Sequence, residues 1–326
     1  MSEQPALRVG VIGVGSMGQN HVRVYRELPE TNLVGITDAD IEQAESVADA
    51  FGTDALEMDE LLEAVDAVSI AVPTPYHYET ARECIDAGVN VLVEKPFVEK
   101  LENGRRLIEF ADQRDVVLQV GHIERFNPAV MTLMDLLDDL DIIALDAQRL
   151  GPPLDRDIED TAVMDLMIHD LDILLAILDE EVEKVYAAGT RESNYATATI
   201  QTESGRIGEL TASRVTQQKV RQLTITAENC RVIVDYTDQS IEITRQSLPE
   251  YARENDSFRY RHENVIEQVL VERREPLKNE LSAFAEAVRT ESEPLVTGED
   301  GIRALELARE IDELASERVP APADTV

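Results

Sequence analysis

Apolar runs alternate with helical patterns through the first third of the chain. Helical spacing covers residues 19–25, 78–87 and 101–114. The intervening runs are short and continuously apolar, as in parallel strands covered on both faces, and lie at 9–12, 33–37, 67–72, 89–93 and 116–120. This βαβ rhythm predicts a doubly wound parallel sheet.

The pattern changes after Gly121. An unusually apolar helix is predicted over 161–178, a polar loop over 247–262, and two helices, one opening at Pro276 and one over 302–314. Between them lie β-rich segments at 184–190, 195–202, 206–215, 221–227, 231–236 and 241–246. Short turns separate most of these segments, which predicts a largely antiparallel sheet with a helix on one face.

We therefore expect an α/β chain of two domains. Residues 1–122 would form an N-terminal Rossmann domain with a parallel sheet. Residues 123–326 would form an α+β domain with a large, mostly antiparallel open sheet. A C-terminal helix near 301–318 is expected to pack back on the first domain, and residues 320–326 are expected to fray.

Composition indicates the cellular compartment of the protein and the partners that it would repel. It has two distant cysteines, no apolar run of about 18 residues, and an N-terminus without the basic and apolar parts of a secretory signal. We therefore expect a cytoplasmic, reduced protein. Sixty-six acidic against 30 basic residues give a net charge of −36, which should repel nucleic acid and anionic membranes.

The acidic residues are spread along the whole chain. Their mutual repulsion should destabilise a compact state in dilute buffer, but at molar salt the Debye length falls to about 3 Å and screens most of it. We therefore hypothesise adaptation to a salt-rich cytoplasm. The alternative is a mesophilic protein that is merely acidic.

A glycine turn follows the first predicted strand. Gly13, Gly15 and Gly18 have the G-x-G-x-x-G spacing, with Ser16 and Met17 between them, in front of a predicted helix. The first glycine permits a tight turn, the second a close approach of pyrophosphate, and the third close packing of helix on strand. Phosphates would then lie at the helix N-terminus.

The second predicted strand ends at Asp38, 20 residues after Gly18. An acid at this distance is suited to the ribose hydroxyls of NAD and repels the additional phosphate of NADP. The sequence therefore predicts NAD. The alternative is a Rossmann-like fold whose nucleotide site is empty or binds another ligand.

Two further strand ends carry candidate residues. Glu94 and Lys95 follow the strand over 89–93, at the edge where ligands bind in open α/β sheets, and Lys95 could there reach a substrate hydroxyl beside the nicotinamide. The alternative is a surface salt bridge between Glu94 and a neighbour, with Lys95 solvated. Pro73, Thr74 and His77 follow the third strand. We expect these three residues, together with Glu94 and Lys95, to line the cofactor site. His77 could equally pack against the next helix.

The apolar helix carries a narrow polar stripe. Asp165, His169 and Asp172 follow i, i+4, i+7 spacing and would lie on one face of an α-helix. They could form an acid–base pair facing a polar cleft, with the aspartate orienting the imidazole. The alternative is a structural Asp–His pair in the core. Neighbours suited to zinc are lacking, so no metal is expected.

The segment over 121–128 lies where the two domains should meet. Arg125 could bind a phosphate or carboxylate of the substrate, and an interdomain ion pair is the alternative. We include Arg125, Asn127 and Asp172 as expected substrate-binding residues.

Taken together, these motifs resemble the glucose–fructose oxidoreductase and inositol dehydrogenase (Gfo/Idh/MocA) family nearly from end to end. The resemblance rests on the glycine loop, residues 71–75 with His77, Glu94-Lys95-Pro96, the Asp165/His169 helix and the late helix from Pro276. It implies an NAD(P)-binding domain and a C-terminal domain whose open sheet makes homodimer or homotetramer contacts. It also implies that Lys95, Asp165 and His169 are the catalytic group.

Within the family, residues 121–128 and 165–170 look most like those of UDP-N-acetylglucosamine 3-dehydrogenases. Gly151-Pro152-Pro153 and residues 154–157 replace the glycine-rich approach that is common before the catalytic helix, which leaves the sugar open. The expected reaction is hydride transfer from a sugar alcohol to NAD, with Lys95 and His169 converging beside the dinucleotide and either one as the base.

Three alternatives remain open at this point. They are an inositol or free-monosaccharide dehydrogenase, a hydro-lyase or glycosidase that uses NAD transiently, and a non-catalytic NAD-binding regulator.

Overall fold

The computed structural model describes residues 5–153, 160–246, 250–254, 257–261 and 263–316. Two compact units divide the chain. Unit 1 runs to Phe126 and also includes Arg274–Glu306, and unit 2 comprises Asn127–Arg273 and the residues from Leu307 onward. The division therefore differs from a single boundary after residue 122, because the chain returns to unit 1 near its end.

Unit 1 is built on a parallel sheet, as the apolar runs predicted; five of its six strands lie in those runs, and the two-residue strand β3 was not predicted. The strand order β3-β2-β1-β4-β5-β6 is that of a doubly wound dinucleotide-binding fold. The strands are β1 (Leu7–Ile12), β2 (Thr31–Thr37), β3 (Asp54–Ala55), β4 (Ala67–Ile70), β5 (Asn90–Glu94) and β6 (Leu118–Gly121).

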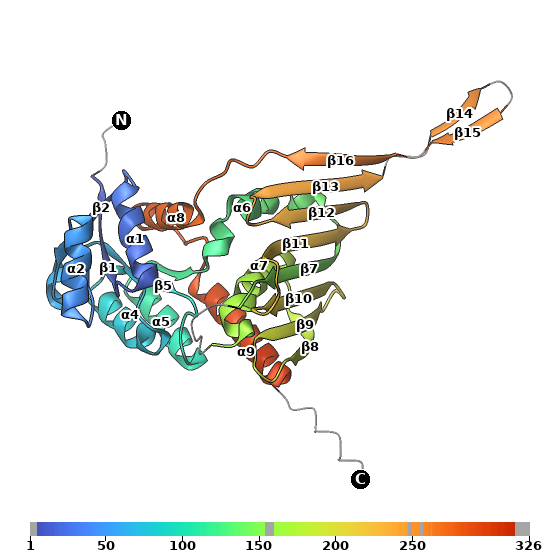
Figure 1. The fold of residues 1–326 in the computed structure, drawn as a ribbon. Helices are drawn as coiled ribbons and strands as arrows, with labels where there is room; N and C mark the ends of the chain where they lie inside the picture. Colours follow the sequence, from blue (N-terminus) through green and yellow to red (C-terminus); the bar gives the residue numbers. More distant parts are fainter. Residues whose placement is uncertain (1–4, 154–159, 247–249, 255–256, 262, 317–326) are drawn as a thin grey trace, which may run out of the picture. The chain divides into compact units, whose positions relative to one another are not determined.

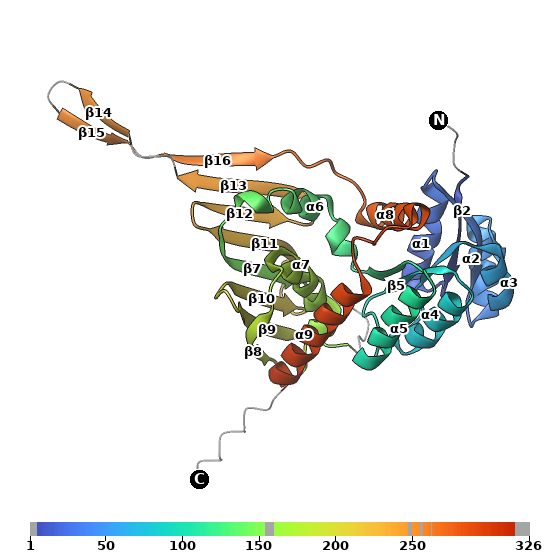
Figure 2. The same ribbon diagram turned by 180° about the vertical axis from the view of Figure 1, so that it is seen from behind.

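Helices cover the sheet of unit 1. Helix α1 packs against α8, and α4 packs against α5 (Figures 1 and 2). The helices are α1 (Ser16–Glu27), α2 (Ile41–Phe51), α3 (Met58–Ala64), α4 (His77–Asp86), α5 (Leu101–Gln113), α8 (Pro276–Thr290) and the first part of α9 (Gly298–Ser316). Leu281 and Phe284 of α8 are fully buried in the same core as Val9, Val22 and Tyr25, so the late helix completes this core.

Unit 2 contains an eight-stranded sheet in the order β16-β13-β12-β11-β7-β10-β9-β8. All neighbouring strands are antiparallel except β7 and β10, so the expectation of a mostly antiparallel sheet is confirmed. The strands are β7 (Ile142–Leu150), β8 (Val182–Gly189), β9 (Tyr195–Thr202), β10 (Ile207–Ser213), β11 (Val220–Ala227), β12 (Cys230–Asp235), β13 (Ser240–Gln246) and β16 (Asn264–Val269).

The sequence patterns missed several parts of unit 2, among them helix α6 (Pro128–Met134). The central strand β7 was not predicted, nor was β16. The predicted loop over 247–262 contains the hairpin of β14 (Glu250–Glu254) and β15 (Ser257–Arg261), which pair with each other. Polar residues dominate this hairpin, so it gives no apolar alternation that would reveal its strands.

The apolar helix of unit 2 is not α-helical throughout. A π-helical turn, Val163–Met167, precedes α7 (Ile168–Leu178), and both pack against the sheet along with α6 (Pro128–Met134). The π turn changes the angular spacing between Asp165 and His169, so the predicted stripe is not that of one regular α-helix. Such turns are frequent at functional sites.

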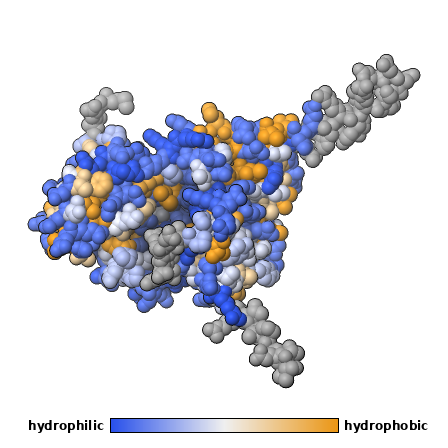
Figure 3. Space-filling view, in the orientation of Figure 1, coloured by the Kyte–Doolittle hydropathy of each residue, from blue (hydrophilic) through white to orange (hydrophobic). Residues whose placement is uncertain are grey.

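Hydrophilic residues cover most of the described surface on the face drawn in Figure 3. Within the described ranges, no helix has both the length and the apolar character that a membrane crossing requires.

Candidate active site

The glycine turn has the geometry that a pyrophosphate needs. Gly13 has φ +86°, where other residues are strained, and a Cβ on Gly18 would lie 1.9 Å from the carbonyl oxygen of Gly13. A Cβ on Gly15 would meet nothing within 4 Å, so open space faces the backbone there. Gly15 also caps α1 without a side-chain hydrogen bond, which leaves the first-turn N–H groups around Ser16 and Met17 suited to phosphate oxygens.

Asp38 ties the end of β2 to the glycine turn. Its carboxylate accepts hydrogen bonds from the backbone N–H groups of Val14, at 2.7 Å, and Asp40, at 3.0 Å. The N–H of Gly13 donates to the carbonyl of Thr37 nearby, at 2.8 Å. Each carboxylate oxygen can accept further bonds, so Asp38 fits both the loop and two ribose hydroxyls.

Lys95 stands at the carboxyl end of β5, in the turn that leads from Glu94 to Phe97. Lys95 is half-buried, whereas Phe97 is completely buried. In a parallel sheet the carboxyl ends of the strands share one edge, so this turn and the glycine turn after β1 lie at the same edge, with β4 between their strands.

Pro73, Thr74 and His77 follow β4 at this edge, but in different environments. Pro73 is exposed and Thr74 half-buried. His77 is 1% exposed, its Nδ1 lies 3.1 Å from the Pro96 carbonyl oxygen, and its Nε2 lies 2.9 Å from that of Val72. This geometry favours the packing alternative for His77 over a cofactor contact. Burial lowers the pKa of this imidazole, and the backbone carbonyls offset part of the effect.

In unit 2, Asp165 and His169 lie on either side of the junction between the π turn and α7. The Asp165 carboxylate accepts a hydrogen bond from the Arg214 guanidinium at 2.8 Å, and Arg214 also donates to the carbonyl of Thr161. His169 is half-buried in the first turn of α7. Sequence patterns missed the role of Arg214, which lies within the predicted strand over 206–215, directly after the observed end of β10, and fixes Asp165.

The three expected substrate-binding residues are all buried. Arg125 is 8% exposed and forms an ion pair at 3.5 Å with Asp300, both in unit 1. Asn127 is 2% exposed, accepts the N–H of Ala129 at the start of α6 and donates to the carbonyl of Tyr236. Asp172 is 1% exposed. These contacts hold Arg125 within unit 1 and Asn127 within unit 2, and their substrate-binding role stays a prediction.

Another acid of the apolar helix, Asp170, has the most clearly defined partner. Arg149 of β7 donates to both of its carboxylate oxygens, at 2.7 and 2.9 Å, and both side chains are almost fully buried. Arg149 takes an inward position in the alternation of β7, in line with Leu145 and Ala147. Once β7 is known, an arginine at an inward position of the strand indicates a buried acidic partner, because a buried charge must be paired.

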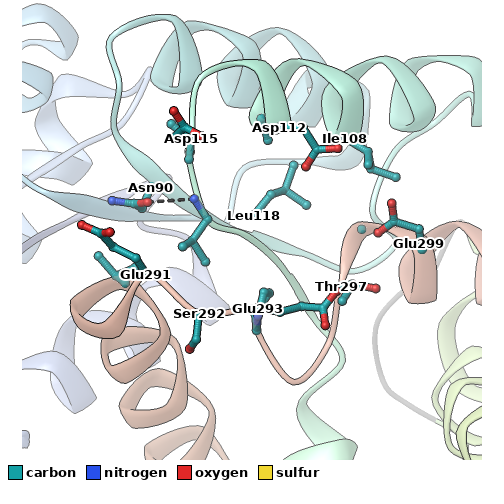
Figure 4. Close-up of a pocket in the computed structure, with 16 residues that line it drawn as sticks. Asn90, Ile108, Asp112, Asp115, Leu118, Glu291, Ser292, Glu293, Thr297 and Glu299 are labelled. Carbon is teal, nitrogen blue, oxygen red and sulfur yellow. Dashed lines mark hydrogen bonds between the residues drawn. The ribbon is translucent and has the colours of Figure 1, made fainter.

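A cavity of unit 1, about 800 Å³, opens at the opposite edge of the parallel sheet. Asn90 and Leu118, the first residues of β5 and β6, line it, and the Asn90 side chain accepts the N–H of Val117 (Figure 4). The remaining polar wall is mostly carboxylates: Asp112, Asp115, Glu291, Glu293 and Glu299. An anionic dinucleotide would be repelled there, so this cavity is not the cofactor site. Among the described residues, no cluster of side chains has an arrangement suited to a metal ion.

Comparisons with known proteins agree with this geometry. The sequence pattern of the oxidoreductase family with an NAD-binding Rossmann fold matches residues 7–122, and that of the family's C-terminal α/β domain matches residues 154–322. The chain belongs to the Gfo/Idh/MocA oxidoreductase family. It is therefore an oxidoreductase with a dinucleotide-binding domain.

Within this family, curated relatives cover most of the chain. A UDP-N-acetylglucosamine 3-dehydrogenase of Acidithiobacillus ferrooxidans is 33% identical over 313 residues, 94% of this chain and 96% of the relative. A myo-inositol 2-dehydrogenase of Thermotoga maritima is 29% identical, covering 92% and 93% of the two chains. A solved structure of the A. ferrooxidans enzyme aligns with TM-score 0.88 at 31% identity, over 97% of this chain and 100% of that one.

Proposed function

We propose that this oxidoreductase transfers a hydride from a secondary alcohol of a sugar or nucleotide sugar to NAD, with the 3-position of UDP-N-acetylglucosamine as its reaction site. The observation that carries the proposal is the shared sheet edge, where the glycine turn suited to pyrophosphate and the Lys95 turn lie within the same unit. The similarity to the A. ferrooxidans enzyme over 94% of the chain supports the nucleotide sugar.

When bound, NAD supplies the hydride acceptor. Gly13, Gly15 and Gly18, with Ser16 and Met17, would bind its pyrophosphate, and Asp38 would accept hydrogen bonds from its ribose hydroxyls. The negative charge of Asp38 would disfavour the 2′-phosphate of NADP. NAD preference would be refuted by equal turnover with the two dinucleotides at equal concentration.

Lys95, Asp165 and His169 are the proposed catalytic group. His169, or Lys95, would take the proton of the substrate hydroxyl as the hydride leaves its carbon. A protonated Lys95 would stabilise the developing negative charge on the oxygen through a charge-assisted hydrogen bond. Asp165, fixed by Arg214, would orient the other two side chains.

Replacing Lys95 or His169 by alanine tests these roles. Loss of a general base typically lowers hydride transfer by about 10²- to 10⁴-fold. A rate within about threefold of the parent would remove that residue from the mechanism. Asp112→Asn serves as a matched surface control, because Asp112 lines the acidic cavity at the other sheet edge and should leave the rate unchanged.

A substrate panel separates the nucleotide sugar from the alternatives. NADH formation at high salt would be followed with UDP-sugars, free hexoses and inositols. The T. maritima relative is the observation that favours an inositol dehydrogenase as the second candidate, and turnover of inositols alone would establish it. Consumption of substrate without net NADH would indicate a hydro-lyase or glycosidase. NAD binding with no turnover at all would indicate a regulator.

We also propose that the protein is cytoplasmic and that copies of the chain associate as a homodimer or homotetramer through the sheet of unit 2. Large apolar side chains on its strands are exposed and support such a contact: Ile143, Tyr186, Ile207, Val265 and Ile266. Light scattering at high salt tests it, and a monomer would refute it.

A further inference from the structure

Two buried histidines fasten the turn that carries Lys95 from different elements of unit 1. His21 lies in α1, one and a half turns after its start at Ser16, and is completely buried. Its Nε2 lies 3.0 Å from Oε1 of Glu94, the last residue of β5. The helix that begins at the glycine turn therefore also holds the end of the strand from which Lys95 emerges.

The bond between His21 and Glu94 has a defined direction. Among the described residues, Nδ1 of His21 is buried and has no hydrogen-bond partner. A proton on Nδ1 would be buried without an acceptor, so the tautomer that fits carries its proton on Nε2 and donates it to the Glu94 carboxylate.

The Glu94 carboxylate is constrained by two more contacts. Its Oε2 accepts the backbone N–H of Lys95 at 3.2 Å, so the carboxylate orients the residue that follows it. It also lies against Gly121 at the end of β6, where a Cβ would be only 3.2 Å from the same oxygen. Three elements thus fix one carboxylate: α1, the turn itself and β6.

His77 of α4 holds the other end of the turn. Its Nδ1 lies 3.1 Å from the carbonyl oxygen of Pro96 and 3.2 Å from that of Phe97, while Nε2 faces the carbonyl of Val72 after β4. The turn is therefore tied to histidines of two separate helices: His21 bonds to the Glu94 carboxylate before Lys95, and His77 lies against backbone carbonyls after it.

A buried polar pair costs desolvation and is weak evidence for added stability, but it does specify geometry. We propose that His21 is a positioning residue for Lys95 and acts through Glu94. Because His21 and the phosphate-binding first turn share α1, the lysine is positioned by the same rigid helix that would hold the dinucleotide. This inference rests on the proposed function, since it gives Lys95 a role in hydride transfer.

His21→Leu removes the donor and places an apolar side chain of similar size in the core. His21→Gln retains an N–H donor. A misplacement of about 1 Å can cost about 100-fold in rate, so we expect His21→Leu to lower kcat by about 10- to 100-fold. The dissociation constant for NAD should stay within about twofold, and His21→Gln should recover most of kcat. A kcat for His21→Leu within about threefold of the parent would overturn the proposal.

The decisive comparison uses the Lys95→Ala background. If His21 acts through Lys95, His21→Leu should lower the remaining rate there by less than about threefold, because the effects of coupled residues are not additive. An equal loss in both backgrounds would show a general structural role and overturn the proposal. Tyr25→Phe is the matched control: Tyr25 is also buried in α1, but its hydroxyl bonds to Ser69 of β4 at 2.7 Å. It should lower the melting temperature and leave kcat unchanged.

A readout without turnover separates this inference from the proposed function. Acetylation of Lys95 relative to exposed Lys100 is measured by peptide mass spectrometry after brief treatment with acetic anhydride. Freeing the turn in His21→Leu should raise this ratio by at least about threefold, while Tyr25→Phe leaves it unchanged. An unchanged ratio in His21→Leu would overturn the positioning role. Absence of NADH formation from every substrate, with the ratio still raised, would refute only the proposed function.

Discussion

The ion pair between Arg149 and Asp170 provides the sharpest test of how unit 2 is held together. Both side chains are almost completely buried, at 5% and 3% exposure, and two parallel hydrogen bonds of 2.7 and 2.9 Å join them. The pair connects β7, in the middle of the sheet, to α7, whose first turn carries His169. Asp170→Asn removes the negative charge and leaves the guanidinium buried.

The expected cost follows from this burial. Removing one member of a buried ion pair typically costs about 3–5 kcal/mol, because the remaining charge is neither hydrated nor paired. The face of the Tyr236 ring, 5.7 Å from the guanidinium carbon, offers only partial compensation. We therefore expect Asp170→Asn to lower the free energy of unfolding of unit 2 by about 3 kcal/mol or more.

Urea unfolding in molar KCl, followed by circular dichroism, measures this loss. Glu267→Gln is the control in the same sheet: its partner Arg245 lies 3.7 Å away and both side chains are exposed by more than a third, so the change should stay below about 1 kcal/mol. The double variant Arg149→Met/Asp170→Leu should recover most of the stability. A loss below about 1 kcal/mol for Asp170→Asn, or a double variant as unstable as the single one, would refute the reasoning.

Three further outcomes are expected. The melting temperature should rise between dilute buffer and molar KCl, because a net charge of −36 is then screened; a flat or falling value would reject salt adaptation. Burial lowers the pKa of His77 below its ordinary value of 6.5, so the unfolded chain binds a proton that the folded one does not, and stability is lost as the pH falls below about 6.5. His77→Gln should lose less stability than the parent over that pH range in urea titrations, and parallel losses would contradict this account. Gly18→Ala should weaken NAD binding by at least about tenfold in calorimetric titration, because its Cβ would collide with Gly13. Gly151→Ala is the control and should leave binding unchanged, because the nearest atom to its Cβ would be 3.9 Å away. Equal affinities for the parent and both variants would argue against the glycine geometry.

The parallel sheet of unit 1 was predictable because each of its signals is local. A buried strand needs only a few consecutive apolar residues, and the glycine turn needs three glycines within six positions. The strand Ile142–Leu150 escaped prediction because an inward arginine interrupts its apolar alternation. The partner that makes this arginine acceptable lies 21 positions away, in another element.

Thus the sequence by itself determined the two kinds of sheet, the dinucleotide-binding turn and the identity of the candidate catalytic side chains. Only the tertiary structure decided which polar groups meet: His21 reaches Glu94 across 73 positions, and α8 returns after more than 100 residues to complete the first core. It also decided that Asp165 lies in a π turn beside Arg214. These outcomes depend on how helices pack onto sheets, because distance along the chain does not fix which buried groups become neighbours.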